Sequence, residues 1–437
     1  MDSVVQTFNR HIGCAPIRKI ATSKSNNQPP YKHGLSLTSQ LPFCSVPVRL
    51  DSYNGCQFGC EYCFASTRNG HGRNSVLRSY RPKNLAKRLS RISNGIVNSA
   101  LDELLDRRIP IQFGGMSDPF SPLERKRGVT QQILEILREY QYPYVVSTKS
   151  TMVAENPYLE IVAASNSYVR FSTTIIDHAI KPDIDRGCPS VNQLSVSAEN
   201  LANAGVPVCF RFQPIVPGYE ECAYELIDLA ASVGVRHVSA EFLKVSGEAN
   251  RNFGKHLLKI LGESPIETYK QLGAHFHGRE LVLPLEYRAA HLADMCRETR
   301  YKGITFGFAD NDLLIHSDGR SCCSGSDLYL NCQVFDSNIV GLAKGKTHGD
   351  LIRFAELSER WRPHNLISPY LNSKSRIDGR AADQPEWEKY SQAYWNGAKG
   401  LYRPDFFDGV EDTSAFDDEG NKVYVRAKSK FESQMEI

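Results

Sequence analysis

Residues 46–65, VPVRLDSYNGCQFGCEYCFA, join a short apolar run to a loop that holds three closely spaced cysteines. The apolar run predicts a β-strand over 46–51, because aliphatic residues alternate there with polar ones. Cys56, Cys60 and Cys63 follow the strand directly, with the spacing C-x3-C-x2-C. In parallel α/β proteins, active-site loops gather at the carboxyl ends of the strands, so we expect this loop to carry chemistry.

The sequence after this first strand alternates between apolar runs and helical patterns. Further strands are predicted at 109–115, 143–148, 168–174, 206–212 and 235–243. Helices are predicted at 130–140, 156–165, 191–205 and 219–234. Such alternation favours a mostly parallel sheet with helical crossovers. Because six strands fall short of the eight of a closed barrel, we expect an α/β fold with an open, partial (β/α)6 TIM-like barrel.

Three regions are predicted along the chain. Residues 1–45 are rich in Ser, Asn, Gln and Pro and suggest an N-terminal arm. Residues 46–245 would form the partial barrel. Residues 246–437 would form a mixed α+β C-terminal extension that covers the barrel and helps to bind substrate.

The composition excludes several classes of protein. The chain has 437 residues, of which 41% are hydrophobic and 23% charged, which is typical of a globular protein. It contains no apolar run long enough to span a membrane, and it does not begin like a secretory signal. We therefore expect a cytoplasmic protein without a membrane partner. The 12 cysteines are too few for a disulfide scaffold in so long a chain, so clustered cysteines favour metal binding or catalysis.

Three thiolates at the spacing of Cys56, Cys60 and Cys63 can hold three irons of a [4Fe–4S] cluster and leave the fourth iron open. An open position is what a catalytic metal needs, whereas a structural site is closed. Gly55 and Gly59 allow the backbone to fold closely around a cluster. A zinc knuckle with a distant fourth ligand, or three structural cysteines, are the alternatives.

With Tyr62 before the last cysteine, the loop resembles the signature of the radical SAM superfamily. The resemblance implies a partial barrel of the radical SAM type with two cofactors, one three-cysteine [4Fe–4S] cluster and S-adenosyl-L-methionine. It implies that the reduced cluster cleaves S-adenosyl-L-methionine to a 5′-deoxyadenosyl radical that abstracts hydrogen. A reductant such as flavodoxin or ferredoxin would be needed. Cys56, Cys60 and Cys63 would be metal ligands, and they and Tyr62 would be catalytic.

Across residues 46–243 the match is most similar to the spore photoproduct lyase-like subgroup. It rests on FGGMSDPFSPLERKRGVTQQILEIL, VVSTKS at 145–150, FSTTI at 171–175, Arg186 and AGVPVCFRFQPIVPGYE at 204–220. The resemblance implies cofactor contacts by five residues: Gly114, Gly115, Ser117, Lys149 and Ser172. A cation and hydroxyls suit the acceptor oxygens of S-adenosyl-L-methionine. The alternatives are a solvated lysine and turn hydroxyls that bond the nearby backbone.

Two departures from that subgroup concern hydrogen donation. Spore photoproduct lyase finishes its reaction with a cysteine donor, and the matching position here is Gly115. Its relay tyrosine after the third cluster cysteine is replaced by Phe64. Without a donor, the enzyme would return hydrogen from 5′-deoxyadenosine to the product, which suits a redox-neutral isomerisation. Cys188 or Cys209 could instead supply a relocated donor.

The resemblance and the missing donor together suggest rearrangement of a modified thymine in DNA. Moving an amino-acid substituent from nitrogen to carbon linkage would be such a reaction. Virally encoded thymine hypermodification would include it, and the chain would then act in the host cytoplasm. The alternatives are thymine lesion repair with a relocated hydrogen donor and a non-catalytic iron–sulfur protein that binds nucleic acid.

The charge distribution supports a DNA partner independently. Residues 1–91 hold 14 Lys and Arg against three acids, a net charge of +11, whereas the whole chain has +3. Residues 68–91 contain eight Lys and Arg and no acid, and with Tyr80 they could follow a phosphate backbone. A thymine in a duplex would have to be flipped out to react. An ordinary solvated helix face is the alternative.

A second cysteine cluster lies at Cys322, Cys323 and Cys332. It could bind an auxiliary iron–sulfur cluster with His316 or Cys296, supply a hydrogen-donating thiol, or be structural. The other cysteines are expected in the core or in loops: Cys14, Cys44, Cys188, Cys209 and Cys222. Glu220 and Glu241 are placed near the active face or are solvated charges.

Overall fold

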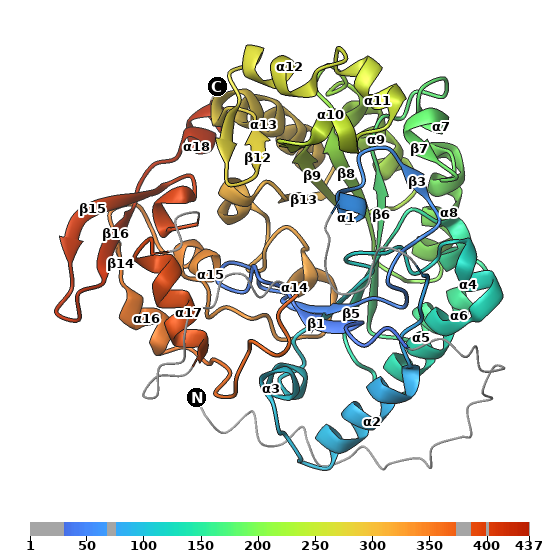
Figure 1. Cartoon of the computed structure of the whole chain (residues 1–437), viewed down its shortest axis with the longest axis horizontal. Coiled ribbons are helices and arrows are strands. Elements are labelled where there is room, and N and C mark those ends of the chain that lie inside the picture. Colours follow the sequence, from blue (N-terminus) through green and yellow to red (C-terminus); the bar gives the residue numbers. More distant parts are fainter. Residues whose placement is uncertain (1–29, 68–75, 373–385, 399–401, 437) are drawn as a thin grey trace.

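The structure is a computed structural model, and it describes residues 30–67, 76–372, 386–398 and 402–436. Its centre is an eight-stranded sheet in the order β1-β2-β4-β5-β6-β8-β9-β13 (Figure 1). Its strands are β1 (Leu35–Leu37), β2 (Val48–Leu50), β4 (Ile111–Phe113), β5 (Tyr144–Thr148), β6 (Ser167–Thr173), β8 (Val208–Ile215), β9 (His237–Phe242) and β13 (Thr305–Phe308). From β2 to β13 neighbouring strands are parallel, and β1 pairs antiparallel with β2.

All six predicted strands are present, which confirms the α/β fold with a mostly parallel sheet. The predicted number of strands was too small, because β13 adds a seventh parallel strand beside β9. Four helices separate β9 from β13, so the strand–helix alternation is interrupted before the last strand. β1 lies within the predicted arm and β13 within the predicted C-terminal region, and both join the sheet. The division at residues 45 and 245 stays a prediction.

Helices connect the parallel strands. They are α2 (Pro82–Ser93), α3 (Ala100–Asp106), α4 (Pro122–Arg127), α5 (Val129–Glu139), η1 (Thr151–Ala154), α6 (Tyr158–Ala163), α7 (Lys181–Ile184), α8 (Val191–Asn203), α9 (Cys222–Ser232), α10 (Ala249–Asn252), α11 (Lys255–Ile260), α12 (Pro265–Gln271) and α13 (Leu285–Tyr301). The four predicted helices correspond to α5, α6, α8 and α9. A capping box between Ser190 and Gln193 starts α8, and Gly205, with φ +80°, follows its end.

Smaller elements surround the central sheet. Short strands are β3 (Gly59–Cys60), β7 (Asp185–Arg186), β10 (Val245–Ser246), β11 (His275–His277), β12 (Glu280–Val282), β14 (Leu351–Ile352), β15 (Val410–Phe416) and β16 (Lys422–Arg426). The remaining helices are α1 (Phe64–Thr67), η2 (Asn311–His316), α14 (Ser326–Tyr329), α15 (Ile339–Lys344), α16 (Phe354–Ser358), α17 (Glu386–Trp395), η3 (Pro404–Phe406) and α18 (Lys430–Met435). Among the described residues, no helix has the length and apolar character needed to cross a bilayer.

The two faces of the sheet differ in chemistry. One face carries aliphatic and aromatic residues, such as Val169 and Phe171, that belong to the large core shared with the helices. The opposite face, here called the inner face, carries Val145, Tyr168 and Cys209, which form a separate small core with Leu330. Further along the same strands the inner face becomes polar. Because strand side chains alternate between faces, the positions that follow at intervals of two point toward the same interior.

Candidate active site

The cysteine loop follows the carboxyl end of β2, as predicted. Cys60 lies in β3, which pairs antiparallel with β7, and the N–H of Cys63 donates to the carbonyl of Cys60 at 3.2 Å. The buried Glu61 carboxylate accepts the backbone N–H groups of His256 and Leu257 at 2.9 and 2.8 Å. The loop is therefore fixed at both sides, by β7 and by the start of α11. All three predicted cysteine ligands are partly exposed.

The three sulfurs of the cysteine loop are not gathered around one metal position. Two thiolates on one zinc ion lie at most about 4.6 Å apart, because each Zn–S bond is about 2.3 Å long. The sulfurs of Cys56, Cys60 and Cys63 do not all lie within 4.8 Å of one another. This arrangement does not fit a mononuclear zinc ion held by three thiolates. A polynuclear iron–sulfur cluster does not require such closeness, because there each cysteine binds a different iron.

Two further residues approach Cys60 from the β7 segment. The sulfur of Cys188 lies 4.0 Å from that of Cys60, and with Asp185 they form a group whose ligand atoms all lie within 4.8 Å. The hydrogen bond from Cys188 lowers the pKa of Cys60 against the effect of burial, and the charge of Lys149 lowers it further. A thiolate is the form of cysteine that binds metals. Neither Cys188 nor Asp185 was predicted as a metal ligand.

Asp185 connects two of the predicted site residues. The Tyr62 hydroxyl donates to its carboxylate, the Lys149 Nζ lies 3.3 Å from its Oδ1, and the Lys181 Nζ lies 3.0 Å from its Oδ2. Burial alone would raise the pKa of Asp185, but the two lysines and the hydroxyl lower it to about 2. Burial also opposes the charge of Lys149, yet Asp185 raises the pKa of that lysine above its usual range. Asp185 is thus an ionised anchor that orients Tyr62 and Lys149.

The turn after β4 carries Ser117 and Asp118. The N–H of Ser117 donates to Asp51 Oδ1 at 3.1 Å, and its hydroxyl donates to the carbonyl of Tyr53 at 2.6 Å. Ser117 is buried, so its hydroxyl contributes to holding the turn against the end of β2. Asp118 accepts the N–H of Lys149 at 2.6 Å and thereby joins the turn to the end of β5. Burial raises the pKa of Asp118, although Lys149 and neighbouring hydrogen bonds oppose this.

Gly114 and Gly115 are adjacent but have different roles. Gly114 has φ +86°, and a Cβ there would overlap the carbonyl oxygen of Ser147 and approach Pro119 Cδ to 2.7 Å. Only glycine fits at this position, because both the backbone conformation and the neighbours exclude a side chain. Gly115 has no positive φ, and its Cβ would meet only Arg49 Cδ, at 3.2 Å. A side chain at Gly115 is therefore compatible with the fold.

Ser172 lies on the inner face at the end of β6. Its carbonyl accepts a hydrogen bond from the Lys149 Nζ at 3.3 Å, which places these two predicted residues side by side. Within the described part of the chain its hydroxyl makes no hydrogen bond, so it is available to a ligand. Ser117, Lys149 and Ser172 thus follow or end three neighbouring strands at one edge of the sheet.

Two buried arginines on the inner face, Arg170 of β6 and Arg211 of β8, were not predicted as site residues. Arg170 is 1% exposed and donates to the Ser147 hydroxyl at 2.8 Å. Arg211 is paired with Ser172 in the sheet, and its guanidinium lies 3.7 Å from Glu241. Burial and the charge of Arg170 lower the pKa of Arg211. The interior is therefore positively charged, and the signal in the sequence was a basic residue inside each of two apolar strands.

Glu220 and Glu241, the two glutamates considered in the sequence analysis, both have bonding partners inside the protein. Glu241 also pairs with Lys244 at 2.5 Å, so it belongs to the charged network of the inner face. Glu220 is buried and accepts from the Tyr287 hydroxyl at 2.5 Å and from the Gly218 N–H at 2.8 Å. Neither is a solvated surface charge.

The second cysteine cluster packs against the inner face near the amino ends of β6 and β9. Cys332 contacts the small core around Tyr168. The carbonyl of Cys323 lies 3.3 Å from Nε2 of the buried His237. Cys322 is buried, and a hydrogen bond links it to Cys44 of the N-terminal segment. Through these contacts the segment that carries Cys322, Cys323 and Cys332 packs at the amino ends of the parallel strands, away from the cysteine loop.

The fourth ligands considered for an auxiliary cluster have other partners. His316 pairs with Asp408 at 3.1 Å, and Cys296 is buried in the large core. In the regions that the structure describes, no three metal-binding side chains that include Cys322, Cys323 or Cys332 lie within 4.8 Å of one another. The contacts of these cysteines are those of packing residues; Cys322 is buried, and Cys323 and Cys332 are partly exposed.

Comparison with known proteins gave structural similarities alone. No family model matches the chain, and no curated protein matches it. Among solved structures it is similar to spore photoproduct lyase complexed with dinucleoside spore photoproduct, at 18% identity over 61% of this chain and 77% of that chain, with a TM-score of 0.45. A mutant of that lyase with bound AdoMet and the same photoproduct gives 16% identity and a TM-score of 0.45, with the same coverage. SuiB of Streptococcus suis bound to S-adenosylmethionine gives 16% identity over 53% of this chain and 48% of that chain, with a TM-score of 0.34. The first two of these structures are of spore photoproduct lyase, which gives its name to the subgroup that the sequence motifs resemble.

Proposed function

We propose that this chain is a radical SAM enzyme whose single [4Fe–4S] cluster is held by Cys56, Cys60 and Cys63. The observation that carries the proposal is the loop of three partly exposed thiols after the carboxyl end of β2, where a hydrogen bond from Cys188 and the charge of Lys149 favour the thiolate form of Cys60. When bound, the cluster and S-adenosyl-L-methionine supply a 5′-deoxyadenosyl radical that abstracts hydrogen from carbon. A flavodoxin or ferredoxin would supply the electron.

The residues at the end of β4, β5 and β6 would bind and orient S-adenosyl-L-methionine. Lys149 is held by Asp185 and by its own backbone bond to Asp118, so its ammonium group is fixed before any ligand arrives. The hydroxyl of Ser172 is available beside it. Ser117 would contribute only acceptor lone pairs, because its hydrogen is donated to Tyr53. Gly114 would act by fixing the conformation of the turn, because protein atoms already fill the space beside it, and Gly115 would keep a side chain out of the site.

The site offers little hydrogen to a product radical. Gly115 has no side chain, and Phe64, which is 48% exposed, has no hydroxyl group. The hydroxyl hydrogen of Tyr62 is engaged with Asp185. These features support a reaction in which the abstracted hydrogen is returned to the product and S-adenosyl-L-methionine is regenerated. Such a cycle is redox-neutral and favours an isomerisation.

The proposed reaction is rearrangement of an amino-acid-substituted thymine in DNA. The bond between the thymine methyl carbon and the substituent nitrogen breaks, and a bond from the same carbon to the α-carbon of the substituent forms. The hydrogen lost by the α-carbon is gained by the nitrogen, so the formula is unchanged and no external oxidant is needed. The buried arginines of the inner face, Arg170 and Arg211, would attract the carboxylate of the substituent.

Thymine lesion cleavage with a relocated thiol is the second candidate function. The observation in its favour is Cys188, whose sulfur lies 4.0 Å from that of Cys60. Cys323 is a further partly exposed thiol, and it lies within reach of the charges of Arg211 and Arg170. A lyase would need such a donor, whereas an isomerase would not.

The test is anaerobic incubation of the reduced, iron-loaded protein with S-adenosyl-L-methionine and DNA that carries the substituted thymine, labelled with deuterium at the α-carbon. Mass spectrometry should find a carbon-linked product with the elemental composition of the substrate, and part of the deuterium should appear in the recovered S-adenosyl-L-methionine. Cys188→Ala should retain this activity, and Cys222→Ala is the matched control remote from the cluster. Unchanged connectivity of the substituent would overturn the isomerase, and cleavage of a thymine lesion by the wild type but not by Cys188→Ala would favour the lyase.

A further inference from the structure

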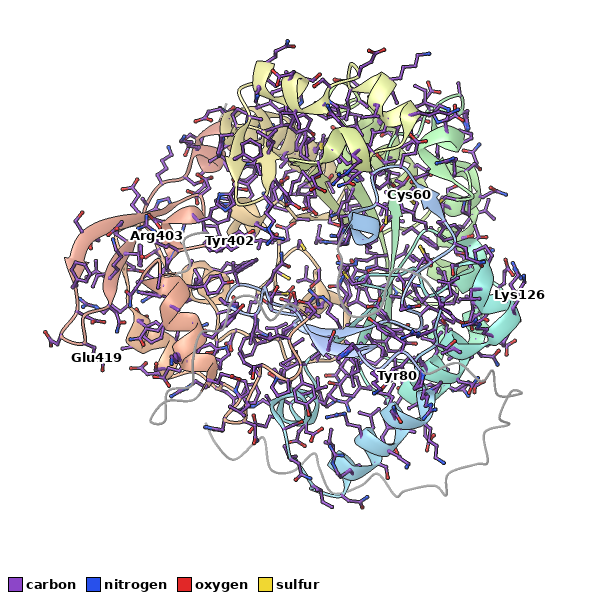
Figure 2. The ribbon with its side chains drawn as sticks, viewed as in Figure 1. Cys60, Tyr80, Lys126, Tyr402, Arg403 and Glu419 are labelled. Carbon is purple, nitrogen blue, oxygen red and sulfur yellow. The ribbon has the colours of Figure 1, made fainter. Side chains whose placement is uncertain are left out.

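A cleft of about 330 Å³ opens beside the edge strand β1, outside the site described above. Its walls are the exposed face of α2, the segment that leads into β1, and residues 369–372, which run alongside β1. Figure 1 shows α2 and β1 in the same lower part of the molecule, and Figure 2 labels Tyr80, which lines the cleft. The side chains that carry the argument are Lys32, Tyr80, Lys87, Arg88, Arg91 and Tyr370. We refer to this feature as the basic cleft.

The basic cleft is strongly positive. Four of its side chains are cationic, and no carboxylate is found among the described residues that line it. Arg88 and Arg91 share one counter-charge, Asp102, which is buried behind them. Lys32 and Lys87 are exposed and make no ion pair within the described residues. A concave surface with four cations and one recessed acid attracts polyanions.

The geometry of the cleft suits a phosphate backbone. Lys87 and Arg91 are four residues apart and Arg88 and Arg91 are three apart, so the three cations lie on one side of α2. The guanidinium of Arg88 lies 5.6 Å from the ring centroid of Tyr370, which holds its planar donors in a fixed direction. A row of fixed cations can contact successive phosphates, and tyrosine side chains can contact the sugars between them.

Hydrogen bonds connect the basic cleft to the candidate active site. The segment beside Lys32 is joined to the end of β2, because the N–H of Asp51 donates to the carbonyl of Gly34 at 2.8 Å. Asp51 in turn accepts the N–H of Ser117 at 3.1 Å. Tyr80 packs against Gly34 so closely that a Cβ there would lie 2.5 Å from its ring. One end of the cleft is therefore only two hydrogen bonds from the turn that carries Ser117.

We infer that the basic cleft binds the sugar–phosphate backbone of the DNA strand that carries the target base. This inference rests on the proposed function, because it assigns the surface by which that substrate would be held beside the site. Lys32 and Lys87 would contact phosphates directly, and Arg88 would contact one through its stacked guanidinium. The contacts would position the strand without reading its sequence.

The experiment measures binding of a fluorescent DNA duplex to the full, iron-loaded protein at several salt concentrations. Each phosphate contact contributes about 0.9 to the slope of log K against log salt concentration. Lys32→Ala and Lys87→Ala should each lower that slope by about 0.9, and the double variant by about 1.8. Lys126→Ala on α4 is the matched control, since Lys126 is exposed and lies outside the cleft, and it should leave the slope unchanged.

A separate readout keeps this inference distinct from the proposed function. Formation of 5′-deoxyadenosine in the absence of DNA should be unaltered in the lysine variants, because none of the replaced residues lies in the candidate active site. Wild-type slopes in Lys32→Ala and Lys87→Ala would overturn the inference, whether or not the enzyme cleaves S-adenosyl-L-methionine. Displacement of the duplex by equimolar thymidine monophosphate would also overturn it, since the cleft would then be a mononucleotide site. Reduced slopes in a protein that forms no 5′-deoxyadenosine would support it and refute the proposed function alone.

Discussion

Replacing Gly115 by cysteine places a thiol where the resemblance to spore photoproduct lyase puts a hydrogen donor. If the native enzyme returns hydrogen from 5′-deoxyadenosine to its product, the new thiol should compete with that return. The variant should then release 5′-deoxyadenosine and a product that has gained the thiol hydrogen.

The structure predicts that this substitution is tolerated. A Cβ at Gly115 meets only Arg49 Cδ at 3.2 Å, and a flexible side chain can move by a few tenths of an ångström. We expect a loss of less than about 1 kcal/mol in the free energy of unfolding. At Gly114 the positive φ and the overlap with the Ser147 carbonyl oxygen make alanine costly, by roughly 2–5 kcal/mol.

The assay compares wild type, Gly115→Cys and Gly115→Ala under anaerobic reducing conditions. Chromatography gives the ratio of 5′-deoxyadenosine to isomerised product, and urea unfolding gives stability. The ratio should rise in Gly115→Cys and stay low in Gly115→Ala, while Gly114→Ala unfolds at lower urea. An unchanged ratio in a folded, iron-loaded Gly115→Cys variant would refute the reasoning about the missing donor.

Two further predictions concern buried charged groups. Asp185→Asn leaves Lys149 and Lys181 without their shared counter-charge and should lower the free energy of unfolding by roughly 3–5 kcal/mol, measured by thermal unfolding. Asp183→Asn, whose side chain is 56% exposed, is the control and should unfold like wild type. His237 is fully buried, which lowers its pKa to about 4, so it stays neutral when folded but is protonated below about pH 6.5 when unfolded. Stability should therefore fall by about 2 kcal/mol between pH 7.5 and pH 5. The His237→Gln variant should lose about 2 kcal/mol less stability than the wild type over this pH range. Equal losses in the variant and the wild type would contradict the attribution of this pH dependence to His237.

The local signals in the sequence were sufficient for the strands and the cysteine loop. Apolar runs identified β2, β4, β5, β6, β8 and β9, because each strand is buried on the helix side. The loop position followed from the order of strand and cysteines alone. β13 was not counted, because a long helical stretch separates it from β9 and removes the alternation that marked the others.

The residues that complete the site depend on contacts between distant parts of the chain. Cys188 and Asp185 reach Cys60 through the short β3–β7 pairing, which bridges more than a hundred residues and leaves no local pattern. Cys44 meets Cys322 for the same reason. The buried arginines could have been found, because Arg170 interrupts an apolar strand and alternation places it on the inner face. Lys32 could not, since its segment carries no periodic pattern.

Mössbauer and paramagnetic resonance spectra of the anaerobically reconstituted protein, recorded before and after addition of S-adenosyl-L-methionine, test the central claim most directly. The account predicts about four irons per chain in one cluster, with one iron whose signal changes when S-adenosyl-L-methionine is added. Cys56→Ala should abolish the cluster, and Cys222→Ala should retain it. A protein that takes up zinc in place of iron, or a cluster that does not respond to S-adenosyl-L-methionine, would contradict the account.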